Sequence, residues 1–292
     1  MMISVIITAK DEAKTIGKAT AAFKSQDYLG QDFEIIIVAP DEATLKVAGE
    51  SGGQIRTIKD PGRGKSVALN LAVKEAKGET IIFSDGDVVV QDEAVKYLLN
   101  KKEILVSGRP VVAEKQIDIF GFWQKVLFET AHKLRAGKEQ VGQYFPVSGY
   151  LFMIKKAALK DFIFPEESLA EDEYLSYYFW QSGGKIYYEP RAEVRVKGPD
   201  NFHDWVRQKT RTLGGSYQIP RVWKKGRAAR SFVPEAGKAW TLWKDYGDNC
   251  KHRWWLILLF MARLYAWTLA AIKVKILGQK RSQVWQRVES TK

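Results

Sequence analysis

The sequence contains a single cysteine, Cys250, among its 292 residues. One cysteine excludes a disulfide framework and a cluster of thiolate metal ligands. No stretch rich in proline, glycine or serine interrupts the chain before about residue 214, so the first two thirds are expected to form one domain. Low-complexity disorder is excluded as well, because 14 Phe, 12 Tyr and 10 Trp are too many for a chain without a packed core.

The N-terminus lacks a cationic leader and a cleavage site. An apolar strand pattern begins directly at residues 3–9. A secretory signal needs a charged start followed by a longer apolar stretch. We therefore expect neither a signal peptide nor a membrane anchor here, and we expect the folded front part to lie in the cytoplasm.

The net charge of +12 comes entirely from the last third of the chain. Residues 1–197 hold 27 Lys and Arg against 28 Asp and Glu, whereas residues 198–292 hold 19 against 6. So basic a segment favours an anionic partner, either nucleic acid or an acidic membrane surface.

A long apolar run decides between these two partners. Residues 254–272 contain one charged residue, Arg263, and as a helix they would be about 28 Å long, close to the thickness of a bilayer's hydrocarbon core. Basic residues flank the run and tryptophans lie near its ends, which favours a membrane over nucleic acid or a soluble core. Arg263 makes a simple span costly, yet the polar positions around it form no single stripe, which counts against a helix in the membrane plane. Both orientations stay open.

The first hundred residues alternate between strand and helix patterns. Short apolar, β-branched runs predict strands, and the segments between them predict helices, several of which begin at a carboxylate suited to a cap. This order predicts an α/β fold with a parallel sheet flanked by helices, in which ligands bind beyond the carboxyl ends of the strands. The expected strands are 3–9, 34–39, 54–58 and 80–84, and the expected helices are 11–26, 41–49, 64–77 and 92–100.

Acidic and glycine residues follow these strands. Asp85 and Asp87 flank a glycine at the end of one strand, and two such carboxylates can hold Mg²⁺ or Mn²⁺ beside phosphate oxygens. The turn at 62–66 lacks the first glycine of a P-loop, because Lys59 stands in its place. The turn still offers a helix start for a phosphate, with Lys65 as a cation; an ordinary strand-to-helix turn is the alternative.

The second part of the chain adds further candidates. We expect strands at 104–112, 148–154, 185–189 and 192–197, and helices at 118–138, 171–182 and 201–213. Glu171 and Asp172 begin the second of these helices, where they either stabilise its N-terminus or act as a general base. In the last helix, Arg207 and Arg211 share a face with Gln208 beside it, which suits either diphosphate binding or a solvated basic surface.

Taken together, four segments resemble family 2 of the inverting glycosyltransferases with a GT-A fold. The segments are SVIITAKDEAKTI (4–16), DPGRGKSVALNLAVKEAKGE (60–79), TIIFSDGD (80–87) and LAEDEYLSYYFWQSGGKI (169–186). They are similar to the opening strand and turn of the family, its Gly-Lys segment, its Asp-x-Asp strand and its Glu-Asp helix. The resemblance covers roughly residues 1–215, and the order and spacing of the motifs make it specific.

The resemblance implies transfer of a sugar from a nucleotide sugar with inversion at the anomeric carbon. Asp87 with Asp85 would hold Mg²⁺ or Mn²⁺, and Asp172, beside Glu171, would take the proton from an acceptor hydroxyl. Gln208 and Arg211 would contact the diphosphate or the acceptor. The nucleotide would contact Ala9, Glu12, Asp41, Lys65 and Asp85.

The acceptor is expected to be a membrane lipid or a lipid-linked glycan at an anionic membrane surface. The processive members carry a Gln-x-x-Arg-Trp helix, and here Thr212 replaces the tryptophan. The chain also lacks the many apolar spans of a polymer channel, so we predict a single transfer. We expect a GT-A domain at 1–214 and a basic, aromatic-rich, membrane-associated region at 215–292.

Three alternatives stay open. A polyprenyl-phosphate acceptor is the second possibility within the family, although a phosphate nucleophile needs no base. A nucleotidyltransferase would usually carry glycines directly after the first strand, where this chain has TAKDEAKT. A non-enzymatic protein that binds membrane surfaces would explain the basic third and leave the strand-end carboxylates without a role. We expect no nucleic-acid partner.

Overall fold

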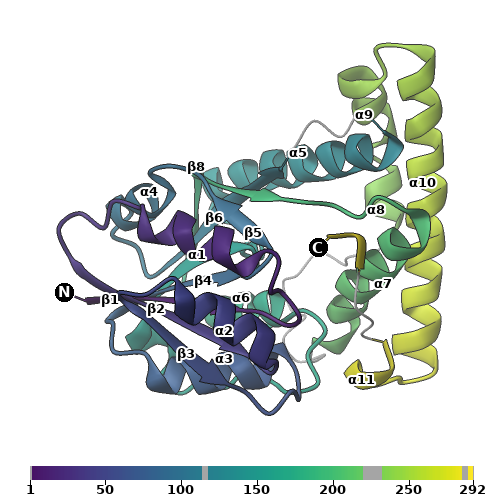
Figure 1. Ribbon diagram of the computed structural model, residues 1–292. Helices are drawn as coiled ribbons and strands as arrows, with labels where there is room; N and C mark the ends of the chain where they lie inside the picture. Colours follow the sequence, from purple (N-terminus) through teal and green to yellow (C-terminus); the bar gives the residue numbers. More distant parts are fainter. Residues whose placement is uncertain (1, 114–117, 220–231, 285–288, 292) are drawn as a thin grey trace.

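The computed structural model of the protein describes residues 2–113, 118–219, 232–284 and 289–291. In these residues eight strands form one sheet in the order β3-β2-β1-β4-β7-β6-β8-β5. The strands are β1 Met2–Thr8, β2 Asp32–Ala39, β3 Ile55–Lys59, β4 Thr80–Asp85, β5 Val88–Val90, β6 Leu105–Val112, β7 Leu151–Lys155 and β8 Ile186–Val196. Helices lie on both faces of this mostly parallel sheet (Figure 1), which confirms the predicted fold class.

The four predicted N-terminal strands form the parallel half of the sheet. β1 pairs with β2 and β4, and β2 pairs with β3, all in parallel. The central residues of β1, β2 and β4 are fully buried, as continuous apolar runs predict for strands covered on both faces. The edge strand β3 has no fully buried residue. Thr8 lies opposite Asp85 in the register, so the carboxyl ends of β1 and β4 meet at one edge of the sheet.

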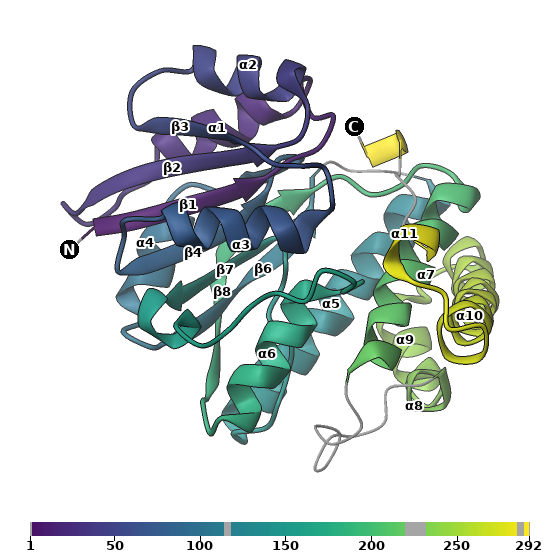
Figure 2. The same ribbon diagram turned by 90° about the horizontal axis from the view of Figure 1, so that it is seen from below.

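The helices form two layers around the sheet. Apolar side chains of α1, α2 and α4 pack on one face, and those of α3 and α6 pack on the other. Figure 2 shows these helices around the sheet. The helices are α1 Ile16–Lys24, α2 Glu42–Glu50, α3 Lys65–Glu75, α4 Ala94–Asn100, α5 Ile119–Gln140, α6 Glu171–Gln181, α7 Phe202–Gln218, α8 Phe232–Ala236, α9 Ala239–Tyr246, α10 Cys250–Ala270 and α11 Arg281–Val284. The first helix begins five residues later than predicted, because Asp11 adopts a left-handed conformation (φ 54°) and a turn precedes Ile16.

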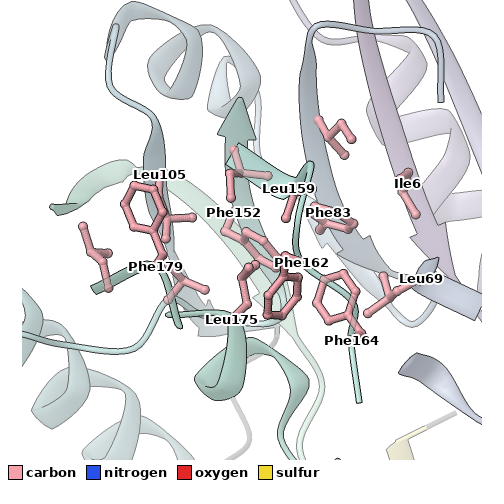
Figure 3. Packing of buried hydrophobic residues seen from close by; sticks show 14 of the residues in the cluster. Ile6, Leu69, Phe83, Leu105, Phe152, Leu159, Phe162, Phe164, Leu175 and Phe179 are labelled. Atoms are coloured by element: carbon pink, nitrogen blue, oxygen red, sulfur yellow. The ribbon is translucent and has the colours of Figure 1, made fainter. Parts of the chain in front are cut away.

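Aromatic residues fill the core between the sheet and α6. Phe83 of β4 stacks on Phe152 of β7 with ring centroids 4.8 Å apart, and Phe164 meets Phe83 edge-on at 6.1 Å. Leu175 and Phe179 of α6 close this cluster from the other side (Figure 3). Burial of these rings fixes the first turn of α6, which carries Glu171 and Asp172, against the end of the sheet.

The other half of the sheet is mixed and departs from the prediction in two places. β7 runs antiparallel to β4 and β6, and β8 runs parallel to β6. The predicted strands at 185–189 and 192–197 are one strand, β8, whose register against β6 shifts between Ser107 and Arg109. That irregularity accommodates Pro190, which lacks an N–H for the ladder. The three-residue strand β5, antiparallel to β8, was not predicted.

Helices α7 to α10 pack beside the sheet domain. α7 and the first part of α5 pack against α10 through a cluster that includes Trp123, Trp205 and Trp267, and Trp123 Nε1 donates to the Trp255 carbonyl at 2.8 Å. Figure 1 shows α10 along the outer edge of the molecule. α7 extends beyond residue 214, so the predicted boundary between two domains falls inside a helix and stays a prediction. Residues 220–231 of the predicted membrane-associated region lie outside the described residues.

The predicted apolar helix at 254–272 lies within α10 and the π-helical turn at Ala271–Ile276. In the described part of the chain, the segment Cys250–Ile276 is the one helix long and apolar enough to cross a membrane, with a mean hydropathy of 1.8. Arg263, its central charge, is buried against the protein. Arg263 Nε and Nη2 donate to Glu235 Oε2 at 2.9 and 2.7 Å.

Candidate active site

A cavity of about 730 Å³ lies at the carboxyl ends of β1 and β4. The glycine turn before α3, the first turn of α6 and one face of α7 complete its walls. In the described part of the chain, eight carboxylates and seven cationic side chains line it. The cavity therefore lies where a parallel sheet binds its ligands, and its charges nearly balance.

Lys65 joins two of the predicted groups in this cavity. Its Nζ lies 2.7 Å from Asp85 Oδ1 and 2.7 Å from Glu171 Oε1, so the start of α3 is connected to the end of β4 and to the start of α6. Burial opposes the charge of Lys65, but the two carboxylates outweigh it and raise the pKa of the ammonium group. Burial also opposes the charge of Glu171, and Lys65 holds the pKa of that carboxyl below its usual value.

Asp87 lies in the same cavity, two residues beyond the end of β4. Burial and the negative charge of Asp85 raise the pKa of Asp87 to about 6, although Lys65 and Arg211 act in the opposite direction. Two carboxylates forced together in this way favour a cation between or beside them. The described residues contain no group of three or more His, Cys, Asp and Glu that could hold a metal, so a metal here would need further oxygen ligands from a substrate or water.

Asp172 is fixed by backbone amides at the start of α6. Its Oδ2 accepts a hydrogen bond from Gly149 N at 2.9 Å, and its Oδ1 accepts one from Glu173 N at 2.9 Å. A Cβ on Gly149 would lie 2.9 Å from Asp172 Oδ2, so only glycine lets β7's preceding turn approach the carboxylate this closely. Burial and the neighbouring charge of Glu171 raise the pKa of Asp172 to about 6.

The predicted nucleotide-binding residues are only partly brought together. Ala9 and Glu12 line the cavity, with Lys65 and Asp85. Asp41 does not line it, because its carboxylate caps α2 by accepting Thr44 N at 2.9 Å and also accepts Asp11 N at 2.7 Å. The role of Asp41 in nucleotide binding therefore stays a prediction.

α7 presents a basic edge to the cavity. Gln208, Arg211 and Thr212 line it, whereas Arg207 pairs with Asp204 at 3.6 Å within the helix. The Lys209 side chain also reaches the cavity, with its Nζ 3.0 Å from Gln208 Oε1. Burial and the positive charges of Arg263 and Arg211 lower the pKa of Lys209 to about 7. Lys209 was not among the candidates predicted from the sequence.

Several residues of the cavity were missed in the sequence. Tyr150 and Phe128 lie at one side, with ring centroids 6.2 Å apart, and burial together with Asp87 and Asp85 raises the pKa of the Tyr150 phenol. Arg281 and Thr291 reach the cavity from the C-terminal segment. No local pattern marks these residues, because their positions depend on the packing of α5 and on the path of the chain after α10.

The comparisons with a family model and with known sequences agree on one family. A family model described as "Glycosyltransferase like family 2" matches residues 2–215. The chain is similar to the poly-β-1,6-N-acetyl-D-glucosamine synthase of Staphylococcus epidermidis, with 25% identity over 227 residues that cover 74% of this chain and 55% of the relative. A synthase of the same name from Staphylococcus aureus (strain MSSA476) is also 25% identical over 227 residues. The chain thus spans about half the length of the curated relatives it matches.

Two solved structures share the fold. The mannosyltransferase PcManGT from Pyrobaculum calidifontis, in complex with GDP-Man and Mn²⁺, aligns with a TM-score of 0.59 and 18% identity over 90% of this chain and 87% of its own. TarS from S. aureus, in complex with UDP-GlcNAc, aligns with a TM-score of 0.52 and 15% identity over 94% of this chain and 85% of its own. At these identities the similarity shows the fold alone.

Proposed function

Because the chain belongs to glycosyltransferase family 2, we propose that it is a metal-dependent, inverting transferase that moves a sugar from a nucleoside diphosphate sugar to an acceptor hydroxyl. The observation that carries the proposal is the meeting of two sets of carboxylates in one cavity. Asp85 and Asp87 at the end of β4 share it with Asp172 at the start of α6. A transferase of this kind needs one set for the metal and diphosphate and the other for the acceptor proton.

The chemistry of the first set fits Mg²⁺ or Mn²⁺. The mutual repulsion of Asp85 and Asp87, which raises the pKa of Asp87, would be relieved by a hard cation with oxygen ligands. When bound there, the cation would stabilise the negative charge on the departing diphosphate. The Mn²⁺ that accompanies GDP-Man in the similar mannosyltransferase supports this assignment.

Asp172 is the proposed general base. With a pKa of about 6, its carboxylate is mostly ionised at neutral pH and still basic enough to accept a proton. The acceptor hydroxyl gives its proton to Asp172, and its oxygen forms a bond to the anomeric carbon. The bond from that carbon to the diphosphate oxygen breaks on the opposite side, which inverts the configuration. Lys65, paired with Asp85 and Glu171, positions the two sets of carboxylates relative to each other.

UDP-N-acetylglucosamine is the proposed donor. The printed name of the similar staphylococcal synthases specifies an N-acetylglucosamine polymer, and the similar TarS structure holds UDP-GlcNAc. GDP-mannose is the second donor to test, because it occupies the similar mannosyltransferase.

The acceptor is proposed to lie at the cytoplasmic face of a membrane. α10 buries one stripe of its surface against the protein and exposes an apolar stripe on the opposite side. The exposed fractions of Trp254, Met261 and Leu264 are 58%, 63% and 50%. The exposed cations Lys251 and Lys275 lie near the two ends of this stripe, where they would meet anionic headgroups.

α10 is proposed to lie in the membrane plane rather than across the bilayer. Because α7 packs along α10, a spanning α10 would carry Asp204 and Arg207 of α7 into the hydrocarbon, at a cost of several kcal/mol for each charge. Arg263, the residue that made the sequence ambiguous, faces the protein and pairs with Glu235. The outward stripe therefore carries no central charge.

Vesicle binding tests this orientation. We expect the protein to bind vesicles of phosphatidylglycerol and phosphatidylcholine, to be released by alkaline carbonate, and to bind about tenfold more weakly after Met261→Glu with Leu264→Glu. Ile163→Glu is the matched control, because Ile163 is 75% exposed on a different surface. Equal vesicle binding by the double variant, or resistance to carbonate, would contradict an in-plane helix.

One observation favours a phosphate-bearing acceptor as a second candidate. Lys209 borders the cavity, and Arg211 and Arg263 repel its charge, so an anionic group would be bound favourably there. A polyprenyl phosphate would supply such a group and would attack without a base. Its use predicts that Asp172→Asn keeps most of the activity, whereas a hydroxyl acceptor predicts a loss.

Thermal melting with nucleoside diphosphates tests the proposed function. We expect UDP with Mn²⁺ to raise the melting temperature of the wild type, and we expect Asp87→Ala to abolish this shift. Asp92→Ala is the matched control, because Asp92 is exposed and does not line the cavity. If folded wild-type protein shows no metal-dependent shift with UDP, GDP or CDP, the transferase proposal is wrong and non-enzymatic membrane binding becomes the better account.

A further inference from the structure

The chain returns to the cavity after α10. It leaves the helix at Gly278 in a left-handed turn (φ 60°), and α11 then lies beside α7 (Figure 2). We call the described residues 277–284 and 289–291 the C-terminal strap. Val284 in the strap is buried, and Arg281 and Thr291 line the cavity. The strap is therefore part of the cavity wall.

Arg281 lies on the glycine turn ahead of α3. Its Nη1 donates to the Arg63 carbonyl at 2.8 Å. A Cβ on Gly64 would lie 2.0 Å from the guanidinium carbon and from both terminal nitrogens of Arg281. The guanidinium thus packs on the backbone of Gly64, next to Lys65. A side chain at position 64 would displace the guanidinium from this contact.

Two further hydrogen bonds hold the strap in place. Arg281 N donates to Glu167 Oε2 at 2.9 Å, and Ser290 N donates to Asp204 Oδ2 at 3.0 Å. These bonds tie the strap to the loop before α6 and to the first turn of α7. Backbone bonds to carboxylates of this kind fix the course of the chain, so the position of Arg281 is set independently of its side-chain contact.

An ion pair beside Arg281 connects the glycine turn to the loop before α6. Arg63, in the glycine turn, donates from Nε and Nη2 to Glu166 at 2.8 and 2.7 Å, and Glu166 precedes the residue that holds the Arg281 amide. Arg281 therefore lies where the glycine turn and the loop before α6 meet, on the side of the cavity that carries Lys65.

We propose that the C-terminal strap forms one wall of the donor site and that Arg281 binds the nucleoside diphosphate part of the donor. The inference rests on the proposed function. Because carboxylates and cations nearly balance in the cavity, an anionic donor depends on each cation that faces it. A guanidinium offers a planar fork of N–H groups to phosphate oxygens and a flat face to a nucleobase.

Titration of Mn²⁺-loaded full-length protein with UDP tests this role. We expect Arg281→Gln to weaken UDP binding by about tenfold, as the loss of one charge-assisted contact implies, and Arg281→Lys to weaken it less. Lys280→Gln is the matched control, since Lys280 is the exposed preceding residue and loses the same charge; its UDP affinity should stay within about twofold of the wild type. In turnover, the donor KM should rise for Arg281→Gln with little change in kcat.

The possible outcomes separate the strap from the function. If Arg281→Gln binds UDP as well as the wild type does while Asp87→Ala loses metal-dependent binding, the strap proposal is wrong and the transferase proposal stands. Tighter UDP binding by Arg281→Gln would also overturn it, because the strap would then block the donor site. If the wild type binds no nucleotide, both proposals fail. Should Arg281→Gln fail to fold, Arg281→Lys against Lys280→Gln provides the comparison.

Discussion

The pH dependence of turnover is the sharpest consequence of the geometry around Asp172. Its pKa is raised to about 6 by burial and by the charge of Glu171. The base must be ionised to accept a proton, so about 90% of the enzyme would be competent at pH 7 and about 10% at pH 5. With saturating Mn²⁺, which would keep Asp87 ionised, the rate should therefore fall by about tenfold between these two values.

The assay is the initial rate of UDP release from UDP-N-acetylglucosamine with Mn²⁺ and membranes that supply the acceptor. Asp172→Asn should lower kcat by about 10² to 10⁴ and remove the acid limb, while UDP with Mn²⁺ still raises its melting temperature. That retained shift is the control for folding and donor binding. An unchanged acid limb in Asp172→Asn, or a kcat near that of the wild type, would refute the assignment of Asp172 as the base.

Three further predictions concern the structure around the site. Arg263→Ala should lower the free energy of unfolding by about 2–3 kcal/mol in chemical denaturation, because it leaves Glu235 partly buried without its partner; no change would mean that α10 is not docked as described. Lys209 has a folded-state pKa of about 7, below its unfolded value, so the wild type should gain about 2 kcal/mol of stability between pH 7 and pH 9, and Lys209→Gln should lose that gain. Gly149→Ala should displace the Asp172 carboxylate, which lies 2.9 Å from the added Cβ, and lower kcat by about tenfold without abolishing the Mn²⁺-dependent UDP melting shift; normal kcat would show that the backbone gives way instead.

The parallel half of the sheet was predictable because its signals are local. The strands β1, β2 and β4 are mostly apolar runs between turn residues. Asp41 and Asp118 cap their helices as a carboxylate at a helix start predicts. The mixed half of the sheet was harder to predict from the sequence. Residues 186–196 form one strand because both sides of Pro190 pair with β6. β6 is distant in the sequence, so no local pattern encodes this pairing.

In the candidate site, too, some contacts were predictable from local sequence patterns and others were not. Parallel topology brings strand ends together, so the sequence could place Asp85 near the first strand and Lys65 near Asp85. The contact of Lys65 with Glu171 depends on the aromatic core that fixes α6, and Arg281 reaches the cavity only because the chain turns back after α10. Such long-range contacts are set by packing rather than by periodicity.

The orientation of the apolar helix shows how one residue can mislead. Arg263 lies in the middle of the run, so periodicity alone left no clean apolar stripe. In the structure Arg263 faces Glu235 inside the protein, and the exposed side of α10 is apolar. A polar position on a helix thus needs its partner before its face can be assigned.

The most direct test of the central claim is transfer of labelled N-acetylglucosamine from UDP-N-acetylglucosamine to membranes, followed by determination of the anomeric configuration of the product. Our account predicts Mn²⁺- or Mg²⁺-dependent transfer that converts the α-linked donor into a β-linked product and that is lost in Asp87→Ala and Asp172→Asn. An α-linked product, or equal transfer by both variants, would contradict it.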